Sequence, residues 1–129
     1  MDLPLHIDKH SGIPVYIQLE ERIRLLVHEG RLTPGDPLPT VRALAVDLQL
    51  NANTVARVYR DLQREGILAL ERGIGTFVAD TAGEPIASES FAALTAQVDE
   101  LIEFGRSLGM SAKELSQFIQ ARWKDNQDA

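Results

Sequence analysis

The sequence has 129 residues, of which 44% are hydrophobic and 25% are charged, as expected for one globular domain or a small domain with an appendage. This length excludes large enzyme scaffolds such as the TIM barrel, which needs roughly 250 residues. The absence of cysteine excludes disulfides, thiolate metal sites and a cysteine nucleophile.

The formal net charge of −6 is unevenly distributed, with −1 over residues 1–79 and −5 over residues 80–129. Nucleic-acid-binding proteins are usually basic, so the total charge argues against one, although the nearly neutral first part has room for a local basic face. The N-terminus lacks the pattern of a signal peptide, and no apolar run approaches the ~18 residues of a membrane span. We therefore expect a soluble cytoplasmic protein with no membrane partner.

Three helices are predicted in the first part of the chain by the spacing of apolar residues. The first covers about residues 14–29 and stops at Gly30. The second covers about 40–49 with Thr40 as its N-cap, and the third about 52–65 with Asn51 as its N-cap and Gly66 as its stop. Residues 33–37, Thr-Pro-Gly-Asp-Pro, have the composition of a turn between the first two helices.

Residues 67–78 contain two short apolar runs around a Gly-x-Gly turn, which predicts a β-hairpin. The order of helix, helix, turn, helix and hairpin is that of a winged helix-turn-helix. Residues 80–85 are turn formers without apolar periodicity and predict a linker. We therefore place a winged helix-turn-helix domain at residues 1–80 and a helical tail at residues 81–129.

The tail predicts two helices that form a hairpin. The first covers about residues 88–108, and its apolar stripe is spaced 3, 4 and 3 residues apart. The second begins at the capping box of Ser111 and Glu114. We expect the apolar side chains of both helices to form a dimer interface, while packing of the first stripe within one chain is the alternative. The expected interface residues are Phe91, Leu94, Val98, Leu101, Leu115, Phe118, Ile119 and Trp123.

Three stretches together resemble the DNA-binding domain of the GntR family of bacterial transcription regulators. They are Leu-Pro-Thr-Val-Arg-Ala-Leu-Ala at 38–45, Asn-Ala-Asn-Thr-Val-Ala-Arg-Val-Tyr-Arg-Asp-Leu at 51–62, and Arg-Gly-Ile-Gly-Thr-Phe-Val at 72–78. With the upstream Pro-Val-Tyr-Ile-Gln at 14–18, the resemblance covers roughly residues 12–79. The short tail is similar to that of the YtrA subfamily, whose C-terminal helices serve dimerisation.

The resemblance implies an α+β, mostly α, fold and a regulator, most often a repressor, that acts as a homodimer on an inverted-repeat operator in double-stranded DNA. It implies no enzyme activity and no cofactor, and it leaves a small-molecule effector unknown. His6 and His10 lack the further ligands that a metal site needs, so no metal is expected. The DNA-binding residues that it implies are Thr40, Arg42, Asn51, Asn53, Thr54, Arg57, Arg72 and Gly73.

The residue types suit this role. A helix N-terminus presents unpaired N–H groups to phosphate oxygens, asparagine can bind adenine bidentately, and a threonine methyl group can contact a thymine methyl group. The arginines can clamp phosphates or read guanine, and a wing glycine permits close approach to the duplex.

Other roles account for several of the same residues. Helix capping alone explains Asn51, and an ordinary exposed hairpin charge explains Arg72. Ala52 and Ala56 stand where some better-known relatives carry arginine, and Ile74 stands where a lysine is common in the wing. The alternative function is therefore a winged-helix protein-interaction module without specific DNA binding.

Overall fold

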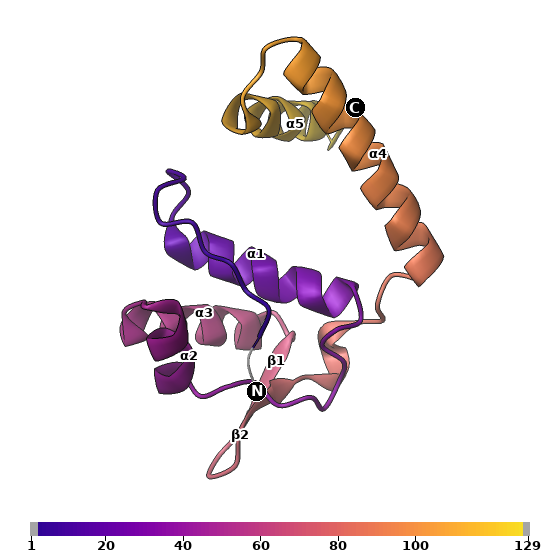
Figure 1. Ribbon diagram of the computed structural model, residues 1–129. Helices are drawn as coiled ribbons and strands as arrows, with labels where there is room; N and C mark the ends of the chain where they lie inside the picture. Colours follow the sequence, from indigo (N-terminus) through magenta and orange to yellow (C-terminus); the bar gives the residue numbers. More distant parts are fainter. Residues whose placement is uncertain (1–2, 128–129) are drawn as a thin grey trace. The chain divides into compact units, whose positions relative to one another are not determined.

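A computed structural model describes residues 3–127, which form two compact units, one ending at Ile86 and the other beginning at Ala87 (Figure 1). The first unit contains three helices, a two-stranded sheet and a short 3-10 helix, and the second contains two helices. Their bounds are α1 Val15–His28, α2 Val41–Leu48, α3 Ala52–Arg64, β1 Leu68–Glu71, β2 Gly75–Val78, η1 Asp80–Ala82, α4 Ser88–Ser107 and α5 Ala112–Gln127.

The core of the first unit lies where α3 packs against both α1 and α2. The apolar faces predicted from helical spacing supply it, because residues three and four positions apart share one side of a helix. The buried residues include Leu19, Ile23, Leu26 and Val27 of α1, Leu44 and Ala45 of α2, and Val55, Val58, Tyr59 and Leu62 of α3. Leu68 and Val78 of the hairpin, which follows α3 in the sequence, complete this core.

The predicted helix caps are confirmed. The Oγ1 of Thr40 accepts a hydrogen bond from the backbone N–H of Ala43 at 3.0 Å, and the Oδ1 of Asn51 accepts one from the backbone N–H of Asn53 at 2.8 Å. Gln49 ends α2 with a left-handed φ of 55°, which makes the sharp turn into α3. These local contacts fix where α3, the expected recognition helix, begins.

The predicted hairpin is also confirmed, with β1 and β2 antiparallel and a three-residue loop, Arg72–Ile74, between the paired residues Glu71 and Gly75. The segment predicted as a turn before α2 also forms an antiparallel bridge with β2, between Pro37 and Phe77. Two of its hydrogen bonds run from Gly35 N to Val78 O at 2.8 Å and from Leu38 N to Thr76 O at 2.9 Å. Proline lacks an N–H group, so Pro37 hides this pairing from a strand pattern.

The segment predicted as a linker is held against the first unit. The Thr81 hydroxyl donates to the carbonyl oxygen of Gly66 at 2.5 Å, and the backbone N–H of Ile86 donates to that of His28 at 2.7 Å. The division between units therefore falls after Ile86, later than the predicted boundary at residue 80. Periodicity did not indicate this attachment because it rests on a few hydrogen bonds and on isolated apolar contacts such as that of Ala82 with the core, and not on a repeated apolar face.

In the second unit, the capping box at the start of α5 is confirmed. The backbone N–H of Ser111 donates to Glu114 at 3.0 Å, and the backbone N–H of Glu114 donates to the Ser111 hydroxyl at 3.1 Å. The hydrogen bonds from Ser111 lower the pKa of the Glu114 carboxyl group. A Cβ placed on the buried Gly105 would lie 3.0 Å from Leu115 Cδ2, so α4 and α5 approach closely there.

Among residues 3–127, no helix combines the length and the apolar character needed to cross a membrane.

Candidate nucleic-acid interface

The first turn of α3 is presented to solvent. Asn51 and Asn53 are exposed, and Thr54 is half-buried. Because the Oδ1 of Asn51 already caps the helix, its amide N–H groups are what it has left for another partner. Asn53 makes no such cap with its side chain and is the more available of the two for reading a base.

Arg42 lies in the first turn of α2 and is exposed, and the hydroxyl of Thr40 caps the same helix. The buried Tyr59 of α3 donates its hydroxyl to the carbonyl oxygen of Pro39 at 2.8 Å. This bond joins α3 to the residue that precedes the α2 cap. Burial also raises the pKa of the Tyr59 phenol above its ordinary value of about 10, so the donating form persists into more alkaline solution. The start of α2 is thereby fixed relative to α3.

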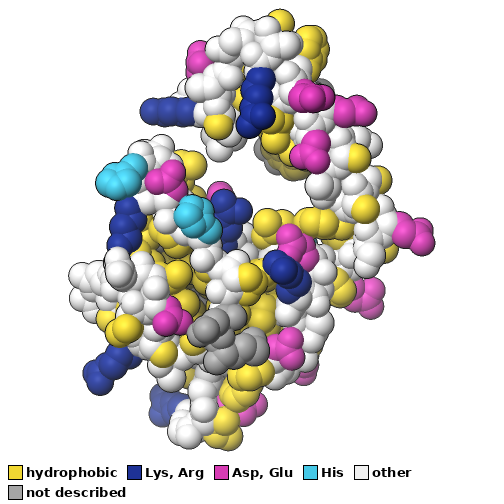
Figure 2. All heavy atoms as spheres, in the orientation of Figure 1, with side chains coloured by type: hydrophobic (Ala, Val, Ile, Leu, Met, Phe, Trp, Pro, Cys, Tyr) yellow, Lys and Arg dark blue, Asp and Glu magenta, His cyan; other side chains and the backbone are white. Residues whose placement is uncertain are grey.

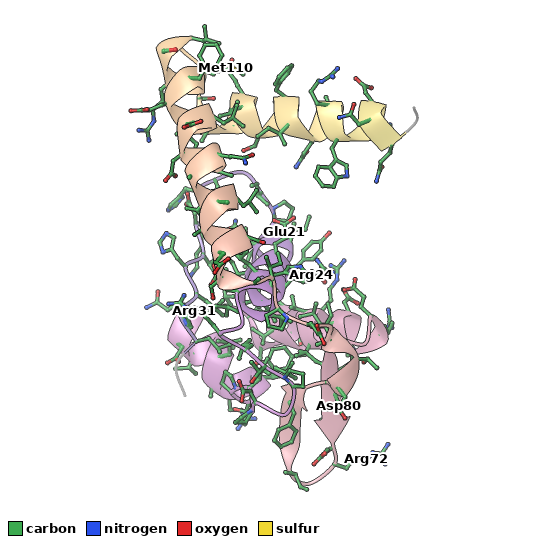
Figure 3. All side chains as sticks on the ribbon, turned by 90° about the vertical axis from the view of Figure 1, so that its right-hand side faces the viewer. Glu21, Arg24, Arg31, Arg72, Asp80 and Met110 are labelled. Atoms are coloured by element: carbon green, nitrogen blue, oxygen red, sulfur yellow. The ribbon has the colours of Figure 1, made fainter. Side chains whose placement is uncertain are left out.

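The hairpin loop carries two further predicted contacts, Arg72 and Gly73. Figure 3 shows Arg72 at the loop end of the hairpin, and both Arg72 and Gly73 are exposed. Gly73 has a φ of +79°, and nothing lies within 4 Å of a Cβ built on it. Its backbone conformation, and not a lack of space, therefore favours glycine. Since the segment before α2 pairs with β2, the loop and α2 belong to one hydrogen-bonded framework.

Arg57 is placed against α1 while remaining partly exposed. Its guanidinium carbon lies 3.9 Å from the ring centroid of Tyr16, and its Nε lies 3.9 Å from Asp61 Oδ2. The side chain keeps 54% of its surface exposed. Arg57 therefore stays accessible to a ligand while one side of its guanidinium rests on an aromatic ring.

Ion pairs divide the arginines of the first unit into two groups. Arg24 binds both carboxylate oxygens of Glu65 at 2.6 Å, which raises its pKa, and Arg64 pairs with Asp61 at 3.6 Å. On α2, α3 and the hairpin, all within the described residues, Arg42, Arg60 and Arg72 form no ion pair. Figure 2 shows basic side chains standing singly among acidic ones on the face it presents. The candidate interface thus relies on a few well-placed cations and not on a broad basic patch.

The same ion-pair network contains Glu20 of α1, whose carboxyl group has Asp61 and Glu65 as acidic neighbours. Burial, followed by a hydrogen bond with Asp61, raises the pKa of Glu20. The network joins α1 to α3 through charged side chains at the edge of the core. Its role in the site is to support α3, because its members are engaged with one another.

The predicted dimerisation residues remain largely open to solvent within one chain. Phe91 and Leu115 are half-buried, whereas Leu94, Val98, Leu101, Phe118, Ile119 and Trp123 are exposed, Trp123 by 68%. A groove of about 380 Å³ between α4 and α5 is lined by several of them. Hydrophobic side chains are visible at the surface of this unit in Figure 2. Packing within one chain therefore leaves most of the stripe uncovered.

Two residues close to the site were missed by the sequence analysis. Tyr16 touches Arg57, and Lys9 donates from Nζ to the carbonyl oxygen of Gln49 at 2.6 Å, at the turn into α3. Both contacts join residues about forty positions apart in the chain, for which no local pattern exists. Within residues 3–127 no group of three or more His, Asp and Glu side chains is arranged to hold a metal.

Comparisons with known proteins agree with this geometry. Residues 15–78 match the family described as "Bacterial regulatory proteins, gntR family". The HTH-type transcriptional repressor YtrA of Bacillus subtilis (strain 168) is 33% identical over 115 residues, which cover 89% of this chain and 88% of that protein.

Two solved structures are similar as well. YtrA from Sulfolobus acidocaldarius, described as a GntR-family transcription factor, superposes with a TM-score of 0.54 at 28% identity and covers 94% of this chain and 97% of its own. AraR(DBD) in complex with operator ORX1 gives a TM-score of 0.50 at 29% identity, covering 61% of this chain and 92% of its own.

Proposed function

Since the chain belongs to the gntR family of bacterial regulatory proteins and is a DNA-binding transcription regulator, we propose that it acts as a homodimeric repressor on an inverted-repeat operator. The relative named a repressor supports the sign of regulation, and the relative solved with an operator supports the ligand. Because its target would be genomic DNA, we place it in the cytoplasm.

The observation that carries the proposal is the exposed, capped N-terminus of α3, together with an exposed arginine in the first turn of α2 that forms no ion pair within the described residues. In our mechanism the first turn of α3 enters the major groove, where Asn53 and Thr54 contact bases. Arg42 and Arg72 then neutralise phosphates on either side, and Gly73 allows the loop to approach the duplex. Asn51 serves mainly as the cap that orients this turn.

Dimerisation follows from the apolar faces of α4 and α5. A single chain leaves them exposed around the groove, and burying such a face is the main driving force for association. The expected partner is a second copy, because closed twofold dimers are the commonest homo-oligomers. Twofold symmetry would place two α3 helices in successive major grooves, about one helical turn apart.

The net charge of −6 fits this mechanism because most of the excess acid lies in residues 80–129. Few cations are free to neutralise phosphates, so we expect weak non-specific affinity and a strong contribution from base contacts.

The proposal is tested by selecting bound duplexes from a random double-stranded DNA pool and sequencing them. Enrichment of an inverted repeat is expected, with half-sites spaced by about one turn of the duplex. If a folded sample enriches nothing at low salt, including with candidate metabolites added, the chain acts instead as a protein-interaction module.

The role of Arg42 is tested by Arg42→Ala on the enriched duplex. Loss of one phosphate contact is expected to weaken binding about tenfold and to reduce the slope of log affinity against log salt by about 1. Arg22→Ala is the matched control, because Arg22 is an exposed arginine on α1 that is not among the predicted contacts. Equal affinities for the two variants would remove Arg42 from the interface.

A further inference from the structure

We propose that Tyr16 is a positioning residue for DNA binding, holding the guanidinium of Arg57 on α3 in place for the operator; this inference rests on the proposed function. Tyr16 lies in the first turn of α1, and its ring centroid is 3.9 Å from the guanidinium carbon of Arg57. That distance is well inside the range of about 6 Å within which a cation and an aromatic face attract one another.

The location of Arg57 makes this contact relevant to the duplex. Asn53, Arg57 and Arg60 are separated by four and three positions, and all three are exposed, so they share the solvent face of α3. Arg57 therefore follows, one turn later, the residue that is most available to read a base. A cation at this place reaches the phosphates that flank the groove.

The side chain of Arg57 is restrained by its neighbours, but its N–H groups remain available to bind a ligand. Its Nε is 3.9 Å from Asp61 Oδ2, which is too long for a hydrogen bond, so that carboxylate does not occupy its N–H donors. A guanidinium that stacks on a ring still has in-plane N–H groups with which to bind a phosphate bidentately. The ring supplies a surface, Asp61 supplies charge, and 54% of the side chain stays exposed for a ligand.

The benefit of this arrangement is entropic. A free arginine side chain loses rotamer freedom when it binds a phosphate, and this loss weakens association. Because Tyr16 already limits the conformations of Arg57, less freedom is lost when DNA binds. Tyr16 thus contributes to operator affinity through Arg57, without itself contacting the duplex.

A double-mutant cycle on the full chain tests this, with the duplex enriched by selection as the probe. Tyr16→Leu is expected to weaken binding about threefold and Arg57→Ala about tenfold, while the double variant binds no more weakly than Arg57→Ala alone. Tyr16→Phe keeps the ring and is expected to bind like the unaltered protein. Unfolding of every variant is measured in parallel, to separate lost affinity from lost stability.

Fluorinated phenylalanines at position 16 give a second measurement that leaves the size of the side chain almost unchanged. Stepwise fluorination withdraws charge from the ring face, so affinity is expected to fall stepwise when Arg57 is present and to stay constant in the Arg57→Ala background. This series replaces Tyr16→Leu if that variant fails to fold.

Three results would overturn the inference. Tyr16→Phe binding as weakly as Tyr16→Leu would show that the hydroxyl itself acts on the duplex. An equal effect of Tyr16→Leu with and without Arg57 would show that the two residues work independently, and full affinity of Arg57→Ala would remove Arg57 from the interface. None of these outcomes requires the unaltered protein to lose its operator, so failure of the inference is distinct from failure of the proposed function.

Discussion

At the scale of single residues, the buried Tyr59 connects stability to the site. Its hydroxyl donates to Pro39 O at 2.8 Å, which ties α3 to the start of α2. A net hydrogen bond contributes about 1 kcal/mol, and a buried carbonyl that loses its partner costs about 1–3 kcal/mol. One atom therefore stabilises the fold and sets the relative placement of the two helices that bear the predicted DNA contacts.

We expect Tyr59→Phe to lower the free energy of unfolding by about 1–2 kcal/mol and to weaken operator binding more than an equally destabilising change elsewhere in the core. Urea unfolding and binding to the selected duplex measure the two effects. Leu26→Val, a truncation in the α1 face of the core, is the stability-matched control. If both variants bind equally well, the bond serves stability alone.

The raised pKa of Tyr59 gives a pH dependence of definite sign. Its folded-state pKa exceeds the unfolded value of about 10, so the folded state retains the proton that the unfolded state releases. The contribution of Tyr59 to stability is complete below pH ~10 and decreases as pH rises above it. Thermal unfolding between pH 8 and 11 should show this decrease, and Tyr59→Phe should reduce it; an unchanged slope would contradict the assignment.

At the scale of elements, the end of α3 is coupled to the segment after the hairpin. Gly66 stops α3 with a φ of +79°, and its carbonyl oxygen accepts the hydroxyl of Thr81 in η1. A Cβ on Gly66 would lie 3.0 Å from Thr81 Oγ1. The position thus imposes both a left-handed backbone and a close contact, so glycine is favoured for two reasons.

Gly66→Ala is expected to lower the free energy of unfolding by more than the roughly 1–2 kcal/mol that a left-handed alanine costs. Gly35→Ala is the matched control, because Gly35 also has a positive φ, of +91°, but nothing lies within 4 Å of its added Cβ. Chemical denaturation of both variants measures the difference. Equal losses would show that η1 simply moves away and that the contact carries no stability.

At the scale of the whole molecule, the two units differ in how much of their hydrophobic surface is buried within one chain. The first unit holds every buried hydrophobic side chain found within residues 3–127, whereas in the second Gly105 is the only buried residue in its described part. A unit with its own core can fold alone. Two helices with open apolar faces are stabilised by association, so the second unit supplies dimerisation in our proposal.

Truncation after Ile86 is expected to give a monomer that still unfolds cooperatively but binds the inverted repeat at least tenfold more weakly, approaching its affinity for a half-site. Sedimentation and titration of both duplexes measure this. Leu101→Glu in the full chain should likewise give a monomer while retaining the helical tail. A truncated protein that remains dimeric would move the interface into the first unit.

The sequence by itself determined the helices, the caps at Thr40, Asn51 and Ser111, and the hairpin with its glycine turn. These features depend on contacts between residues three or four positions apart or across a short loop, so their pattern is visible in one dimension. The family resemblance also indicated which residues are expected to meet DNA.

Only the tertiary structure decided how those residues are supported. It brought Tyr16 beneath Arg57, paired the segment before α2 with β2, and attached the expected linker to the first unit. It also left the stripe on α4 uncovered within one chain. Each of these features depends on residues that are distant in sequence or on a missing partner surface. Periodicity reports which face of a helix is apolar, but not what covers that face or what touches its edge.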